Sequence, residues 1–97
     1  MWIGWLEFDV LLGDVHSLKQ KRSVVRPIIA ELQRKFTVSA AETDSTDLHR
    51  RSGIGVAAVS GDRGHLVDVL DAVERLVAAR PEIELLSVRR GMSRSDD

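Results

Sequence analysis

The chain has 97 residues, of which 43% are hydrophobic and 30% charged; this composition suits one globular domain and excludes an intrinsically disordered protein. Fourteen basic and fifteen acidic residues give a formal net charge of −1, which excludes a histone-like protein that coats nucleic acid by bulk charge. The absence of cysteine excludes disulfide bonds, thiol nucleophiles and cysteine-ligated metal centres.

The first half of the chain predicts a strand, a helix and a second strand. Apolar residues alternate over 2–12, which indicates a strand with one fully apolar face and one mixed face. Ser17 and Gln20 match an S-x-x-Q capping box, which places the start of a helix directly after Ser17. Pro27 lies inside this helix, and we expect it to kink the helix or to split off its first two turns. Residues 36–43 predict the second strand.

The second half repeats this order after a polar connection at 44–52. Residues 53–60 predict a strand in which alternate side chains face inward. The next helix is capped by Asp62 or Ser60 and carries an uninterrupted apolar stripe at helical spacing. It must end near Arg80, because the proline that follows disfavours helical geometry in the residue before it.

A last strand over 83–90 completes the order β-α-β-β-α-β. We therefore expect an α+β fold of one domain over residues 1–90, followed by a disordered polar tail at 91–97. Right-handed crossovers place both helices on one face of a four-stranded antiparallel sheet, the ferredoxin-like plait. Many unrelated functions use this scaffold, so the fold alone assigns none.

The first helix is strongly basic. Residues 16–35 contain six basic residues and one acidic residue, a formal charge of +5, whereas residues 62–84 contain six acidic and three basic residues, a charge of −3. Such a cationic helix suits RNA phosphates. The alternative is an ordinary solvated helix face. The candidate nucleic-acid-binding residues are Lys19, Lys21, Arg22 and Arg26.

Trp5 is a second point of interest, because the predicted register places it with Ile3 on the sheet face away from the helices. Together with Val59 it would form an apolar patch suited to a second copy of the chain. The same face could stack RNA bases, although the central strand over 53–60 carries no aromatic residue. A third possibility is a register error, in which case Trp5 is buried.

The sequence offers no convincing catalytic or metal site. Asp14, His16 and Ser17 are too close in the chain to converge as a triad, and Ser17 already has a capping role. The three histidines lack a ligand spacing. We expect no cofactor, no metal and no enzymatic activity. No apolar run reaches the ~18–20 residues that span a bilayer and no signal segment opens the chain, so we expect a cytoplasmic protein without membrane contact.

Several segments resemble the YlxP-like family of small bacterial proteins. They are HSLKQKRSVV at 16–25 with GWLEFDVLL upstream, SAAET followed by Asp47, Leu48 and Arg51, and IGVAAVSGDRGH at 54–65. The resemblance implies a ferredoxin-like plait and, from the usual neighbourhood of the family's genes among translation factors, a ribosome- or RNA-linked role. It implies no activity, substrate or cofactor. The expected function is an accessory factor that binds RNA or the small ribosomal subunit, and the alternative is a homodimeric or larger homo-oligomeric interaction module.

Overall fold

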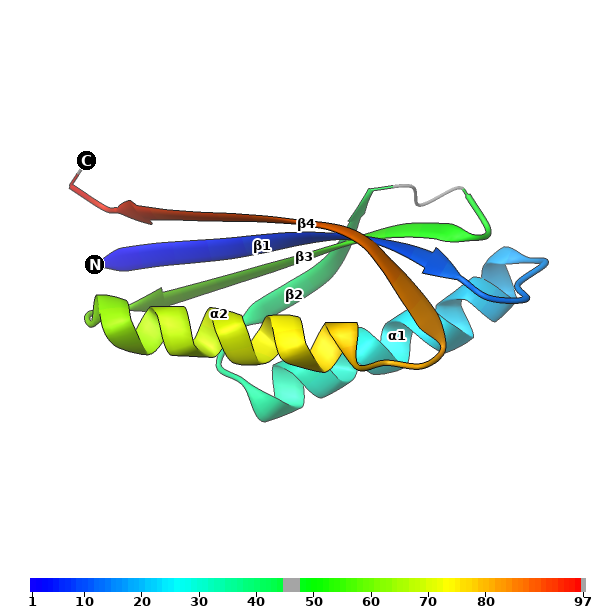
Figure 1. Cartoon of the computed structure of the whole chain (residues 1–97), viewed down its shortest axis with the longest axis horizontal. Helices are drawn as coiled ribbons and strands as arrows, with labels where there is room; N and C mark the ends of the chain where they lie inside the picture. The colour runs from blue at the N-terminus through cyan, green and yellow to red at the C-terminus, as the bar shows by residue number, and fades with distance from the viewer. Residues whose placement is uncertain (45–47, 97) are drawn as a thin grey trace.

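A computed structural model describes residues 1–44 and 48–96, which form a four-stranded antiparallel sheet with two helices on one side of it (Figure 1). The strands lie in the order β2-β3-β1-β4, so that β1 and β3 are central. This confirms the ferredoxin-like plait. The elements in chain order are β1 (Trp2–Leu12), α1 (Leu18–Lys35), β2 (Ser39–Asp44), β3 (Arg51–Ser60), α2 (Arg63–Ala78) and β4 (Ile83–Arg94).

The core lies between the sheet and the helices. In β1 the even-numbered positions from Gly4 to Leu12 are buried, as the alternation predicts, and they face α1 and α2. Gly4 lies directly under α2, since a Cβ there would stand 2.8 Å from a methyl group of Leu70. The buried apolar side chains of the other elements are Val25, Ile28, Leu32, Ile54, Val56, Ala58, Leu66, Leu70, Val73 and Val77.

Both expected N-caps are present. Ser17 Oγ accepts a hydrogen bond from the Gln20 amide at 3.1 Å, and Asp62 Oδ1 accepts one from the His65 amide at 3.2 Å. The capping box is displaced by one residue, because Gln20 Oε1 accepts from the His16 amide at 2.6 Å. In both helices the side chain at the cap satisfies an amide that has no partner within the helix.

Pro27 does not split α1, which continues as one helix from Leu18 to Lys35. The expected separation of the first two turns is therefore wrong. The reason lies in packing, because Val25, before the proline, and Ile28 and Leu32, after it, are all buried against the sheet. Burial of each such side chain contributes about 1.5–3 kcal/mol, so the three together exceed the ~3 kcal/mol cost of an interior proline.

The last strand is longer than the sequence predicts. β4 ends at Arg94, because Gly91, Met92, Ser93 and Arg94 pair with the first four residues of β1. Residues 91–94 thus belong to the sheet and not to a disordered tail, and the Ser95 amide donates to the Met1 carbonyl at 2.8 Å. A partner strand so distant in sequence leaves no local signal in the polar segment itself.

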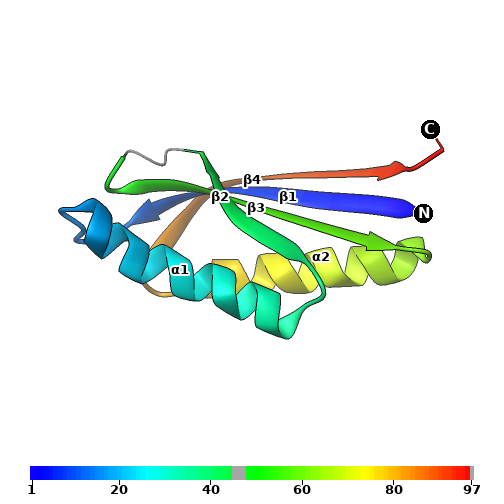
Figure 2. The ribbon, with the colours of Figure 1, turned by 180° about the vertical axis from the view of Figure 1, so that it is seen from behind.

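Smaller boundary differences occur elsewhere. β2 begins at Ser39, three residues later than expected, and β3 begins at Arg51, two residues earlier. Within the part of the chain that the structure describes, both helices lie on one side of the sheet and the opposite side carries none, as the view from behind also shows (Figure 2). Neither α1 nor α2, the helices of the described residues, is both long and apolar enough to cross a membrane.

Candidate nucleic-acid interface

Three basic side chains form an exposed face on α1. Lys19, Arg22 and Arg26 are exposed and follow each other at spacings of three and four residues, which places them on one side of the helix. Among residues 1–44 and 48–96, no acidic side chain forms an ion pair with any of the three. We call these three residues the basic face.

The other cations at the end of α1 differ. Arg34 and Lys35 lie 3.8 Å and 3.9 Å from the carboxylate of Glu31, so their charge is partly compensated on the helix itself. Arg80, two residues after the end of α2, also reaches Glu31, at 3.7 Å. The uncompensated charge of α1 is therefore concentrated in its first half.

Lys21 does not belong to the basic face, and its expected role in binding phosphate is corrected. Only 2% of the side chain is exposed, and its Nζ donates to the carbonyl oxygen of Leu48 at 2.7 Å. The same Nζ lies 3.1 Å from Glu42 Oε2. Lys21 precedes Val25 by four residues and Ile28 by seven, which is the spacing of the core-facing side. That spacing is the signal in the sequence that indicates the burial of Lys21.

Glu42 is the centre of a small polar network beneath the connection between β2 and β3. Besides the ion pair with Lys21, its Oε2 accepts a hydrogen bond from the fully buried Ser52 hydroxyl at 2.6 Å. Arg51 at the start of β3 pairs with Asp9 of β1. Asp47, the first residue of the D-L-x-x-R motif, lies outside the described residues.

A groove of about 260 Å³ lies between α1 and β2. Arg22 and Arg26 of the basic face line it, together with Lys21. Glu42 contributes the acidic side chain on the β2 side. The remaining lining is apolar and consists of Leu18, Val25 and Ile29. We call this the α1–β2 groove.

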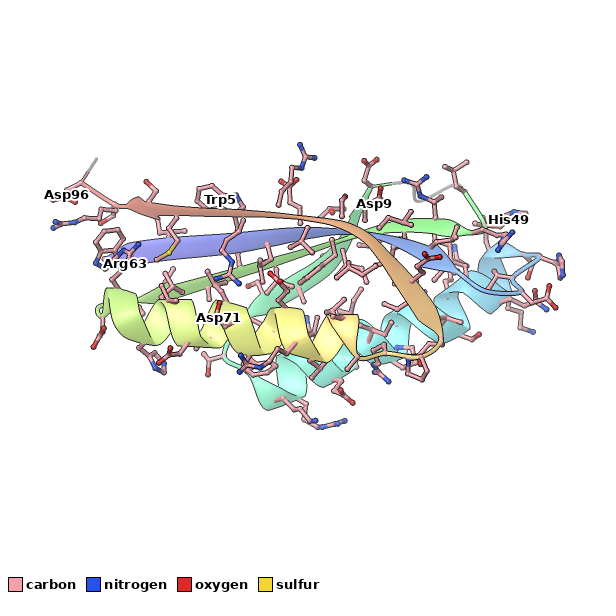
Figure 3. The ribbon with its side chains drawn as sticks, viewed as in Figure 1. Trp5, Asp9, His49, Arg63, Asp71 and Asp96 are labelled. Atoms are coloured by element: carbon pink, nitrogen blue, oxygen red, sulfur yellow. The ribbon has the colours of Figure 1, made fainter. Side chains whose placement is uncertain are left out.

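The sheet face away from the helices carries the second set of candidate residues. Trp5 is 38% exposed and Val59 62% exposed, while Ile3 is half-buried beside them. Figure 3 shows Trp5 and Asp9 on this side of the sheet, so the register that would bury Trp5 is excluded. The indole lies over Gly91, where a Cβ would stand 2.1 Å from Trp5 Cζ2.

This sheet face has an apolar half and a charged half. A shallow trough of about 340 Å³ runs beside Trp5 over the small residues Gly55 and Ala57. At the other end, Glu7 pairs with Arg89 at 3.1 Å and Asp9 pairs with Arg51. Arg51 and Arg89 on this sheet face thus have acidic partners, in contrast to the three residues of the basic face of α1.

The polar residues considered for catalysis or metal binding have structural contacts. The Ser17 hydroxyl is the N-cap of α1, and His16 pairs with Asp14 in the exposed loop before it. No group of three histidine, aspartate or glutamate side chains within residues 1–44 and 48–96 is arranged to hold a metal ion.

Two comparisons with known proteins identify relatives of this chain. Residues 3–90 match the model of a family described as "Protein of unknown function (DUF503)". The chain is also 38% identical over 82 residues to "Uncharacterized protein YlxP" of Bacillus subtilis (strain 168), an alignment that covers 84% of this chain and 89% of the relative. Both matches agree with the resemblance noted in the sequence.

Proposed function

The chain belongs to the DUF503 family, and from this premise we propose that it is a non-enzymatic accessory protein that binds RNA through the basic face of α1. Lys19, Arg22 and Arg26 would each contact a phosphate. The observation that carries the proposal is that these three exposed cations share one face of α1 and form no ion pair within the described residues, whereas several cations elsewhere are paired.

The charge distribution supports this role. Surface cations already paired with carboxylates gain little by exchanging one anion for another, whereas unpaired ones can neutralise phosphates and release counterions. Because the formal net charge is −1, the chain as a whole does not attract RNA, and RNA binding depends on the local positive charge of the basic face. The family resemblance implies a ribosome- or RNA-linked role, and the RNA-containing partner proposed here is the small ribosomal subunit.

The test is fluorescence anisotropy with a labelled single-stranded RNA, followed by co-sedimentation with small ribosomal subunits. The variant Lys19→Glu/Arg22→Glu/Arg26→Glu should lose binding in both assays. The matched control is Arg34→Glu/Lys35→Glu, which changes cations on the same helix that are paired with Glu31. Equal losses in the two variants would indicate a general charge effect and contradict the proposed site; retained binding in the first variant would contradict it outright.

A second candidate function is self-association through the open sheet face. It is favoured by the exposure of Trp5 and Val59 at one end of that face, since exposed large apolar side chains that lie together are typical of interfaces. Sedimentation equilibrium should show dimers that the Trp5→Ser/Val59→Ser variant lacks. A monomer at high concentration for the unsubstituted protein would exclude this function. The two functions are compatible, because α1 and the open sheet face lie on opposite sides of the sheet.

A further inference from the structure

The α1–β2 groove has both cationic and apolar lining residues, whereas a site that binds only phosphate needs no apolar surface. Its rim carries the guanidinium groups of Arg22 and Arg26, and its floor is formed by Leu18, Val25 and Ile29. Leu18 and Ile29 are half-buried, so part of each apolar side chain remains open to a ligand.

The charge of the groove is complementary to an anion. Glu42 is the acidic residue among its lining residues, and this carboxylate is already engaged by Lys21 at 3.1 Å and by Ser52 at 2.6 Å. Arg22 and Arg26 have no such partner among the described residues. The net effect is an uncompensated positive rim, which favours a ligand that brings its own negative charge.

The shape of the groove is held by two polar links between α1 and the edge strand β2. Lys21 contacts Glu42 within the groove, and Gln33 Nε2 donates to the Ala40 carbonyl oxygen at 3.1 Å one turn beyond Ile29. A groove fixed from both elements is preformed, so that a ligand does not have to order it on binding.

From these observations we infer that the α1–β2 groove binds one unpaired nucleotide of a single-stranded RNA. Its phosphate lies against Arg22 and Arg26, and its base lies on the apolar floor, where a guanidinium plane can also stack on it. In a duplex the base faces are stacked inside the helix and cannot lie on the apolar floor, so the groove confers a preference for single strands. This inference rests on the proposed function, which it deepens by naming the class of RNA.

The experiment compares three probes on the same protein: single-stranded oligouridylate, a duplex RNA of equal length, and poly-glutamate as a stand-in for an acidic protein segment. We expect the single strand to bind most tightly. The variant Leu18→Asn/Ile29→Asn should weaken single-strand binding about fivefold or more, because the apolar contact with one base is lost, and leave duplex binding unchanged. Val24→Asn is the matched control, since Val24 is also half-buried on α1 but does not line the groove.

The outcomes separate the two proposals. If neither RNA binds, the proposed function itself is wrong. Equal affinities for the single strand and the duplex would overturn the inference that the groove binds a nucleotide. The same conclusion would follow if Leu18→Asn/Ile29→Asn weakened single-strand binding no more than Val24→Asn does. In either case the basic face would still bind phosphate. Poly-glutamate binding as tight as that of oligouridylate would assign the groove to an acidic protein segment instead.

Discussion

The ammonium group of Lys21 and the carbonyl oxygen of Leu48 lie 2.7 Å apart, although the two residues are separated by 27 positions in the chain. This hydrogen bond joins the first turn of α1 to the connection between β2 and β3. Since the same ammonium pairs with Glu42 at 3.1 Å, a single buried side chain links a helix, a strand and a loop. Lys21, a basic residue of the segment HSLKQKRSVV at 16–25, therefore stabilises the fold.

Replacement of this ammonium tests that role. Lys21→Met keeps most of the aliphatic chain but removes the ammonium donor from the Leu48 carbonyl and from the Glu42 carboxylate, which keeps the hydrogen bond from the Ser52 hydroxyl. We expect the free energy of unfolding to fall by about 2–3 kcal/mol, below the ~3–5 kcal/mol of a fully buried pair because Glu42 is partly exposed. Urea unfolding measures this difference. Lys19→Met, at an exposed position, should change stability by no more than about 0.5 kcal/mol.

The RNA affinity of the folded Lys21→Met protein should stay within about twofold, because the basic face is unchanged. A large loss of affinity with unchanged stability would contradict the assignment of Lys21 as a structural residue and return it to the phosphate site.

The salt dependence of RNA binding counts the phosphate contacts. Three contacts to a single strand predict that log Kobs falls against log salt with a slope of about −2, at ~0.7 per contact. Arg26→Gln should reduce the slope by about 0.7, and Arg34→Gln should leave it unchanged. Anisotropy titrations over a series of salt concentrations measure both. A slope near zero for the unsubstituted protein would exclude phosphate-led binding.

Local patterns in the sequence account for most of the fold. The alternation in β1, the caps at Ser17 and Asp62 and the apolar stripe of α2 are each encoded within a few residues, and each predicts its element correctly. The extension of β4 to Arg94 depends on pairing with the start of β1, which no local pattern reveals.

The site was only partly predictable for a related reason. The helical spacing of Lys19, Arg22 and Arg26 predicts one shared face, but whether each cation has an acidic partner depends on tertiary contacts. The charge of Lys21 suggests a phosphate contact, but its position in α1 decides its role. Its spacing to Val25 and Ile28 places it on the core side of α1, where only a paired ammonium is tolerated.

Pro27 offers a direct test of how packing overrides local preference. Pro27 removes an amide donor inside a continuous helix, so Pro27→Ala should restore one backbone hydrogen bond and stabilise the protein by about 2–2.6 kcal/mol. This gain is the ~3 kcal/mol cost of an interior proline less the ~0.4–1 kcal/mol by which proline restricts the unfolded chain. Thermal unfolding followed by circular dichroism measures the change. Pro81→Ala, beyond the end of α2, is the control and should give no comparable gain. An unchanged midpoint for Pro27→Ala would mean that the surrounding helix has already adapted to the proline.

The contact between Trp5 and Gly91 makes a final prediction about the open sheet face. A Cβ at position 91 would stand 2.1 Å from Trp5 Cζ2, so Gly91→Ala must push the indole off the strand. We expect a loss of about 1–3 kcal/mol, as for other overpacked sites, and a red shift of Trp5 fluorescence as the ring gains exposure. The measurement uses a Trp2→Phe background, in which Trp5 is the remaining tryptophan. Gly61→Ala is the control, since nothing lies within 4 Å of a Cβ there. If Gly91→Ala left both emission and stability unchanged, the indole would not rest on β4 in solution, and the apolar half of the sheet face would have a different shape from the one that favours self-association.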